Sequence, residues 1–239
     1  MSLLTLVQDA ADRLGVVRPS SVIGSSDQQV RQLLALAQQE GKALGRRFDW
    51  DLLRKEKTFT ATATETQSSA CPTDLDRFVP ETFWNRTAAR RVQGPLSSQE
   101  WQNYKAQNTN VIFDAFARRG SSTDLLLAPT PSAGDTYAYE YFSTYWCTSV
   151  GGTTGTQTAW AVDTDIGILS EEIINLGVIW RFKAEKGLSY AEDFRAYETA
   201  ILQQQGWNNA SKRTVNMAQS RDYRGPARPT WPDGSWSIT

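Results

Sequence analysis

Pairs of acidic residues two positions apart are the groups in this chain with the clearest capacity for chemistry. Three such pairs occur: Asp49 with Asp51, Asp74 with Asp76, and Asp163 with Asp165. Carboxylates at this spacing can both reach a divalent cation where the chain turns. No pair has the Gly and the distal Glu of a calcium-binding loop, and Asp165 precedes a predicted helix, where an acidic residue often caps the first turn. We therefore interpret the pairs as structural and expect no metal or other cofactor.

The chain contains no histidine, which excludes several reaction classes. Neither a Ser-His-Asp nor a Cys-His catalytic arrangement can form, and no zinc site with His ligands can be built. Carboxylate chemistry at a sugar is compatible with the residue types, and the nine tryptophans would suit sugar stacking. No spacing selects a carboxylate pair, however. A glycan-binding or carboxylate-dependent glycan-active protein is therefore only the alternative function.

The tryptophans and cysteines have simpler interpretations. Six tryptophans lie beside predicted helices or strands, where packing in a core is the common role: Trp50, Trp84, Trp101, Trp146, Trp160 and Trp180. The two cysteines, Cys71 and Cys147, are expected to be buried free thiols of a reducing compartment. No apolar run approaches the length of a membrane span, and the first residues include acids where a signal peptide would be basic, so we expect synthesis in the cytoplasm.

Residues 1–56 have the apolar spacing of amphipathic helices. A first helix is predicted over 1–14, where Ser2 can cap the start and Gly15 suits a left-handed C-terminal position. A second is predicted over 27–47, beginning near Ser26 with Gln29 three residues later, the spacing of a capping box. Its apolar stripe consists of Val30, Leu33, Leu34, Ala37, Gly41 and Leu44. Such helices need partners from elsewhere in the chain to bury their apolar faces.

From about residue 57 the apolar pattern changes to that of β-strands. Strands are predicted over 57–65, 111–117, 124–127 and 136–142. In the last of these, Tyr137, Tyr139 and Tyr141 share one face. One helix interrupts the strands, because Ser97 and Glu100 have the spacing of a second capping box.

Helical patterns return at Ser170. The helix that begins there has acidic residues at its start and lysines at its end, as the helix dipole favours. One of its faces is predicted to carry Ile173, Leu176, Gly177, Trp180 and Ala184. The next helix opens with a third capping-box spacing, Ser189 with Glu192, and is predicted to end at Gly206.

These elements predict an α+β fold in three parts. Residues 1–56 and 166–206 would form a discontinuous helical bundle. Residues 57–165 would form an inserted, mainly antiparallel β-rich domain. Residues 207–239 would form an extended C-terminal arm.

The predicted arm differs in composition from the rest of the chain. Five basic residues stand against two acidic ones, and three prolines disfavour regular structure. Large aromatic side chains are costly to leave in water, so Trp207, Tyr223, Trp231 and Trp236 indicate a segment that orders on a partner. The alternative is an arm that wraps around its own domain.

Basic residues also gather at Arg86, Arg90 and Arg91 and at Arg118 and Arg119, but no nucleic-acid recognition motif accompanies them. With a formal net charge of −1, the chain does not have the pattern of a sequence-specific DNA-binding protein. The part before residue 207 is acidic. An acidic body could line a passage for DNA, because it would avoid adhesion to phosphate.

Three blocks, in their order along the chain, resemble the head-to-tail adaptor, or connector, family of tailed bacteriophages. They are LLTLVQDAADRLGVVRPSSVIGSSDQQVRQLLALAQQEGKAL at 3–44, CPTDLDRFVPETFWNRTAARRVQGPLSSQEW at 71–101, and WRFKAEKGLSYAEDFRAYE at 180–198. The chain is similar to the adaptors of short-tailed phages (podoviruses), also called tail tubular protein A or gatekeeper proteins. The resemblance covers roughly residues 1–205 and rests on the order of the blocks, not on a catalytic motif.

The resemblance implies a virion structural protein of the neck, at the portal vertex, assembled in the host cytoplasm and without catalytic residues. Adaptors of this family form a homo-oligomeric ring, usually dodecameric, beneath the portal. They extend the DNA channel and provide the platform for the tail nozzle or the next neck protein. Double-stranded DNA would pass through the lumen without sequence recognition, and no membrane contact is expected.

The resemblance carries over to this chain as segments. Helices 1–14, 27–47 and 170–205 would build the ring, and loops of 57–165 would face the tail. The arm would bind the portal protein through Trp207, Arg221, Tyr223, Arg224, Arg228, Trp231 and Trp236. The β insertion is larger than in the smallest, all-helical adaptors, so their simpler geometry does not transfer directly.

Overall fold

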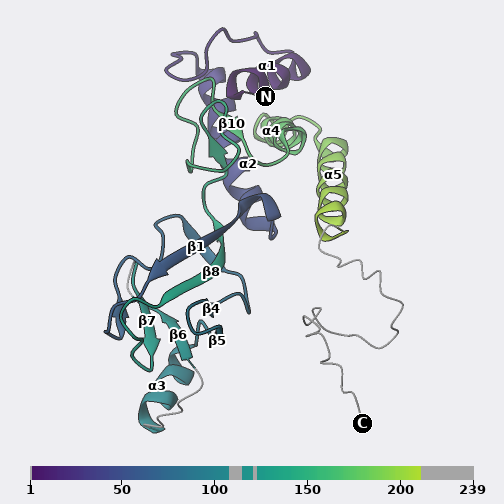
Figure 1. Ribbon diagram of the computed structural model, residues 1–239. Coiled ribbons are helices and arrows are strands. Elements are labelled where there is room, and N and C mark those ends of the chain that lie inside the picture. The colour runs from purple at the N-terminus through teal and green to yellow at the C-terminus, as the bar shows by residue number, and fades with distance from the viewer. Residues whose placement is uncertain (1, 108–114, 121–122, 211–239) are drawn as a thin grey trace, which may run out of the picture.

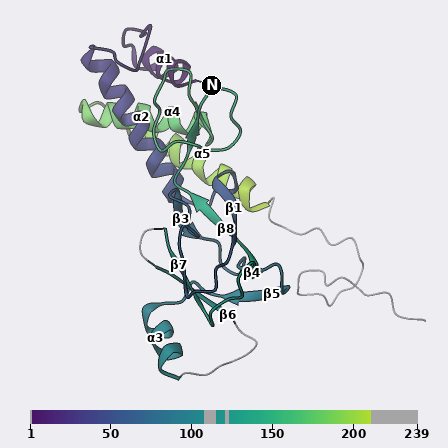
Figure 2. The same cartoon turned by 60° about the vertical axis from the view of Figure 1, so that its left-hand side comes forward.

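A computed structural model describes residues 2–107, 115–120 and 123–210 of the chain. Within these ranges five α-helices and ten strands form a helical part and a β part, stacked end to end (Figures 1 and 2). The two parts are built from different segments, because α1, α2, α4 and α5 come from the two ends of the described chain and most strands come from its middle. The predicted α+β class is confirmed.

The helical part consists of α1 (Leu3–Leu14), α2 (Gln28–Arg47), α4 (Glu171–Glu185) and α5 (Ala191–Ala210). Ser2 caps α1 by accepting a hydrogen bond from the Thr5 amide, and Gly15 ends it with φ of 67°, as predicted. The predicted capping boxes at Ser26 and Ser189 are wrong. Asp27 caps α2 instead, and α5 begins after Tyr190, whose carbonyl accepts its first helical hydrogen bond.

Helix α4 lies at the centre of the helical part and contacts α1, α2 and α5. The predicted face with Ile173, Leu176 and Trp180 does pack against the core, but neighbours on several sides bury further residues of the helix. Leu176 and Trp180, predicted on that face, are only half-buried. Its buried residues are Ile173, Ile174, Asn175, Gly177, Val178, Ile179 and Phe182.

The β part is a strongly curved sheet with strand order β1-β8-β4-β5-β6-β7-β2, and β3 also pairs with β8. Its strands are β1 (Arg54–Thr60), β2 (Thr66–Gln67), β3 (Leu75–Phe78), β4 (Trp84–Asn85), β5 (Arg90–Gln93), β6 (Ala115–Arg119), β7 (Leu125–Ala128) and β8 (Thr136–Ser143). The described pairings in this sheet are antiparallel except that of β5 with β6. Helix α3 (Ser98–Gln107) lies in the connection between these two parallel strands, which need a crossover.

Aromatic side chains fill the interior of the β part. Tyr137, Tyr139 and Tyr141 all point into it from β8, as their alternation predicted. Phe59 of β1 stacks on Tyr137 with ring centroids 5.6 Å apart. The Tyr139 hydroxyl donates to the carbonyl of Ala70 at 2.8 Å, so this interior polar group has a partner.

The segment after β8 packs with the helices, although it was predicted within the β insertion. It contains a small two-stranded sheet, β9 (Cys147–Thr148) with β10 (Ile166–Gly167). Trp146 and Trp160 meet edge to face in the helical core, with centroids 4.5 Å apart. The ring of Trp146 lies so close to α2 that a Cβ on Gly41 would be 2.3 Å from it. The domain division stays a prediction, and this packing favours a boundary near Ser143 over one at 165.

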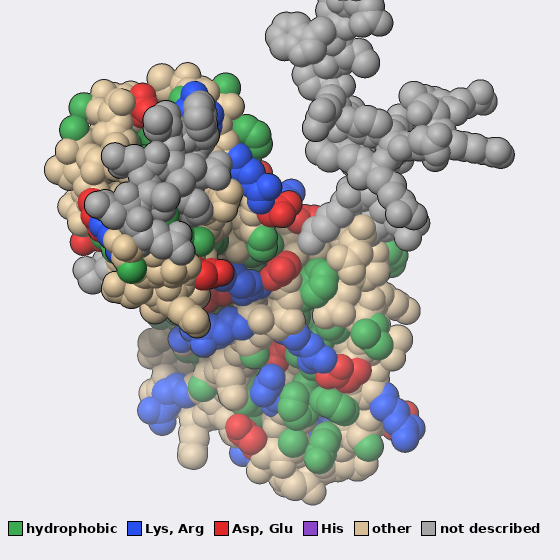
Figure 3. Space-filling view, turned by 90° about the horizontal axis from the view of Figure 1, so that it is seen from below, with side chains coloured by type: hydrophobic (Ala, Val, Ile, Leu, Met, Phe, Trp, Pro, Cys, Tyr) green, Lys and Arg blue, Asp and Glu red, His purple; other side chains and the backbone are tan. Residues whose placement is uncertain are grey.

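Both cysteines are buried free thiols, as predicted: Cys71 in the β part and Cys147 in the helical core. On the face shown in Figure 3, acidic and basic side chains are interspersed with hydrophobic ones, unlike the uniformly basic face of a nucleic-acid-binding protein. Among the described helices, none combines the length and apolar content needed to cross a membrane.

Candidate functional site

The acidic pair in the β9–β10 connection serves structure. The Asp163 carboxylate accepts hydrogen bonds from the amides of Val22 and Ile23, the latter at 2.7 Å, and so fixes the α1–α2 loop. Asp165 is fully buried and accepts from the amides of Ala161 and Val162. It therefore stabilises a turn within the loop, whereas the sequence suggested the first turn of the next helix. Among the described residues, no group of three or more Cys, Asp or Glu is placed to hold a metal ion.

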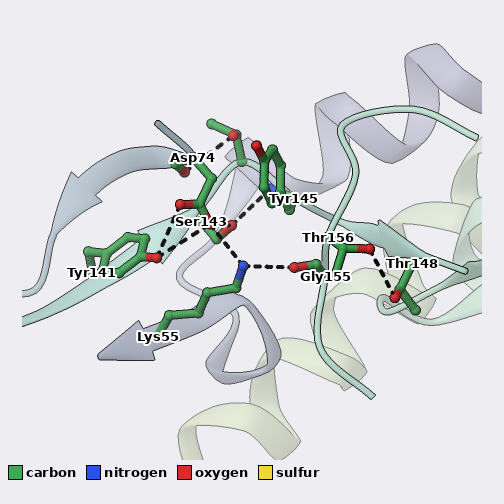
Figure 4. A network of polar contacts seen from close by, with 9 residues as sticks. Lys55, Asp74, Tyr141, Ser143, Tyr145, Thr148, Gly155 and Thr156 are labelled. Atoms are coloured by element: carbon green, nitrogen blue, oxygen red, sulfur yellow. Dashed lines mark hydrogen bonds and ion pairs between the residues drawn. The ribbon is translucent and has the colours of Figure 1, made fainter. Parts of the chain in front are cut away.

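Asp74 belongs to a polar network, centred on Lys55, that links the β part to the β9–β10 connection of the helical part (Figure 4). Its carboxylate accepts from Lys55 Nζ at 2.8 Å, Ser143 Oγ at 2.6 Å and Tyr141 Oη at 3.1 Å. Lys55 also donates to the carbonyl of Gly155 at 2.7 Å, in the β9–β10 connection. Burial alone would raise the pKa of Asp74, but the hydrogen bonds from Lys55 and Ser143 outweigh it and the pKa is lowered.

The other acidic pairs also make ion pairs. Asp76 and Asp49 both pair with Arg77, and Asp51 lies 3.6 Å from Arg54. A sugar hydrolase would need a carboxylic acid whose pKa is raised. Where a described carboxyl group has a clearly displaced pKa, at Glu56, Asp74 and Glu100, the displacement is downward. These three groups therefore do not have the raised pKa that the acid of a sugar hydrolase needs.

A buried carboxylate, Glu40, ties α5 to the rest of the helical part. Its side chain is fully enclosed between α2, α4 and α5. Arg181 Nε donates to it at 2.7 Å and the Tyr197 hydroxyl donates to it at 2.5 Å. Helix α4 approaches closely enough for this only because residue 177 is glycine, since a Cβ there would lie 2.4 Å from the Glu40 carboxyl carbon.

Ion pairs and aromatic contacts complete the attachment of α5, and Phe194 packs edge to face on Trp180 of α4 with ring centroids 5.2 Å apart. Arg47 of α2 pairs with Glu198, and Lys183 of α4 pairs with Asp193 at 2.6 Å. Within the described part of α5, the buried side chains are those of Tyr197 and Ile201. Most of the helix therefore faces solvent.

Exposed apolar side chains gather along α5 and the turn before it. Leu202 and Trp207 are 65% and 68% exposed, and Leu188, Tyr190 and Phe194 are also exposed. In the β9–β10 connection, Val150 and Val162 are exposed as well. Figure 1 places α5 and β10 on opposite sides of α4. The helical part thus presents two different surfaces with apolar side chains.

The structure places one residue of the predicted arm. Trp207 lies in the last turns of α5, which continues to Ala210, so the predicted helix end at Gly206 is wrong. Asn208 holds this end beside the approach to β1, because it donates to the carbonyl of Asp49 and accepts from the amide of Asp51, both at 3.2 Å. The remaining arm residues lie outside the described ranges: Arg221, Tyr223, Arg224, Arg228, Trp231 and Trp236.

One tryptophan predicted to pack in the core is instead exposed. Trp84, in the short strand β4, is 45% exposed and borders a hollow of about 520 Å³ on the outer face of the sheet. Glu56, Glu81, Arg86 and Glu140 also line this hollow. The sequence did not reveal the site, because β4 has two residues and no alternation from which its orientation could be predicted.

Comparison with known protein families gives a match over most of the chain. The family model described as SU10 adaptor protein matches residues 1–230. The matched range includes the helical part, the β part and the predicted arm as far as Arg228, and it ends before Trp231. No curated protein matches the chain.

Proposed function

Because the chain belongs to the SU10 adaptor protein family, we propose that it forms a ring beneath the portal of a tailed bacteriophage and attaches the tail. The family makes it a structural protein of the phage neck and of tail assembly. Resemblance to the tail tubular protein A adaptors of short-tailed phages is the finer part of this proposal. In it, the ring is dodecameric, lies in the virion neck after assembly in the host cytoplasm, and extends the channel through which DNA passes.

The ring contacts come from the helical part. A closed ring needs two different, complementary surfaces on each subunit, because each copy contacts its neighbours head to tail. The side of α5 that carries Leu202 and the connection that carries Val150 and Val162 supply two such surfaces. The β part, at the other end of the molecule, faces the tail nozzle or the next neck protein.

The observation that supports the portal contact best is the largely exposed α5 that leads into a basic, aromatic arm. Trp207 is 68% exposed on this helix, and the next residues carry five basic side chains and two further tryptophans. Tryptophan and arginine are the residues most enriched among those that dominate binding energy at protein interfaces. We therefore assign the portal contact to Trp207, Arg221, Tyr223, Arg224, Arg228, Trp231 and Trp236.

Deletion of 211–239 tests this assignment while leaving α5 intact. We expect the shortened protein to lose at least about a hundredfold in affinity for portal-containing heads, since several interface anchors are removed together. Cosedimentation with purified heads measures the loss. Replacement of Val17, an exposed residue in the α1–α2 loop, by Ser is the control and should leave binding unchanged. Unchanged affinity after the deletion would disprove the portal-binding arm.

A further inference from the structure

The hollow beside Trp84 lies on the outer face of the β sheet. Trp84 of β4 and Thr58 of β1 both pair with Ala138 of β8, and Glu56 pairs with Glu140. Side chains alternate across a strand, so Ala138 and Glu140 face away from the aromatic interior that Tyr137 and Tyr139 fill. Among the described residues, no aromatic ring or cation stacks on the Trp84 indole. One face of the indole is therefore available to a ligand.

Three carboxylates line the same hollow as this indole. Glu56 binds Arg86 at 2.9 Å, Glu81 binds Arg91 at 3.2 Å, and Glu140 lies 3.7 Å from Arg54. An ionised carboxylate has two oxygens and about four acceptor positions, so each can accept a further hydrogen bond beside its arginine. The residues that line the hollow include three acids and one base, Arg86.

An aromatic face beside carboxylates that can accept further hydrogen bonds is suited to a guanidinium group. Arginine stacks on tryptophan through its planar cation and donates to carboxylates at the same time. Lysine fits less well, because its ammonium is a strongly hydrated point charge. The chemistry of the hollow thus favours a segment rich in arginine.

The chain itself supplies such a segment, which begins on the side of the molecule where β4 lies. Residues 211–239 contain Lys212, Arg213, Arg221, Arg224 and Arg228 against Asp222 and Asp233. The segment follows α5, whose end Asn208 fastens to Asp49 and Asp51, just before β1. In both Figure 1 and Figure 2, the end of α5 lies on the side of the β part where β4 and β5 are found.

Chain length allows the contact. From Ala210 to Arg221 an extended chain spans about 35 Å, whereas the seven residues of β1 span about 23 Å. A short tether also gives the arm an effective concentration in the millimolar range at the hollow, so even a weak contact is populated.

We propose that, in the free protein, the arm of the same chain lies against this hollow and stacks Arg221 or Arg224 on Trp84. The inference concerns the arm before it meets any partner and does not depend on portal binding. The occupant is the same chain, because a second copy would not benefit from the tether.

Limited trypsin digestion of the full chain tests the proposal, since trypsin cleaves after arginine and a docked arginine is protected. We expect Trp84→Ala to speed cleavage after Arg221 or Arg224 about fivefold, as suits the loss of one exposed cation–π contact. Intact-mass spectrometry follows each cleavage. The double variant Glu81→Gln with Glu140→Gln should act in the same direction, and Trp84→Tyr should restore part of the protection. Val17→Ser is the matched exposed control and should cleave like the unmodified protein.

Two results would overturn the proposal. Equal cleavage rates in Trp84→Ala and the unmodified protein would show that the hollow is a solvated surface. Protection that grows with protein concentration between about 1 and about 50 μM would assign the arm to a second copy, because a tethered contact is independent of concentration. Circular dichroism of each variant checks the fold. A head-binding loss on deleting 211–239, with no effect of Trp84→Ala on cleavage, would reject this inference and leave the portal proposal standing.

Discussion

The Glu40 carboxylate shows how a single buried charge can orient a helix. It receives hydrogen bonds from Arg181 of α4 and Tyr197 of α5. Burying such a charge is tolerated only when partners satisfy it, so these hydrogen bonds fix the orientation of α5 together with its aromatic contacts to Trp180. The Tyr197 hydroxyl has a raised pKa because it is buried and donates to Glu40, and it therefore stays protonated as a donor.

Asp74 gives a prediction about pH at the residue scale. Its pKa in the folded protein lies below the ordinary value of 3.8, so the unfolded chain binds the proton more tightly. The stabilisation is therefore fully present above about pH 5 and is lost as the pH falls through the lowered pKa. Asp74→Asn should lower the free energy of unfolding at pH 7 by about 1–3 kcal/mol, since Lys55 loses its buried partner.

Urea denaturation from about pH 7 to about pH 3 measures this effect, and the difference between Asp74→Asn and the unmodified protein should shrink as the pH falls. Asp12→Asn, in an exposed pair with Arg18, is the control and should change little at any of these pH values. A difference that stays constant down to the acid end would contradict the role assigned to Asp74.

At the scale of elements, two helical glycines give opposite predictions for the same substitution. Gly177 of α4 has the Glu40 side chain at 2.4 Å from the position of a Cβ, whereas Gly206 of α5 has nothing within 4 Å. Gly177→Ala should destabilise the protein by about 1–3 kcal/mol through overpacking. Gly206→Ala should stabilise it by up to about 1 kcal/mol, because alanine favours the helix. Thermal unfolding of both variants measures the contrast, and a stabilising Gly177→Ala would refute the close approach of α4 to Glu40.

The helices were largely predictable from the sequence because their signals are local. Ser2, Gly15 and the acidic start of α4 mark helix ends through contacts within a few residues. Strands β3, β4 and β5 were not predicted, since each has two to four residues and exists through pairing with distant segments. Their existence depends on tertiary contacts that no local pattern encodes.

The same contrast applies to the side chains of the candidate site. Glu40 stands seven residues after Leu33 and three after Ala37, on the apolar stripe of α2, and this spacing could have revealed a buried charge. Trp84 could not have been identified as exposed, because its orientation follows from pairing with β8. Of the residues predicted to bind the portal, the described ranges include Trp207, which is exposed as a partner contact requires.

At the scale of the whole molecule, we expect the purified protein to be monomeric and to form rings on portals. The exposed apolar side chains of α5 and of the β9–β10 connection are separated by polar residues, unlike the extensive apolar core of an obligate interface. Weak side-to-side contacts would then need a template to close the ring. Multi-angle light scattering with and without portal measures this, and stable rings in the isolated protein would contradict it.

The pairing of β1 with β8 has a consequence for how this molecule can vary. The chain enters the β part at Arg54 and leaves it after Phe142, and these two residues face each other across the same ladder. The two connections between the parts are thus adjacent, so the β part is an insertion that joins the helical part at one place. Such an insertion can lengthen, shorten or be exchanged with little change in the path of the helices. A phage lineage could in this way change the β part and keep the helical part.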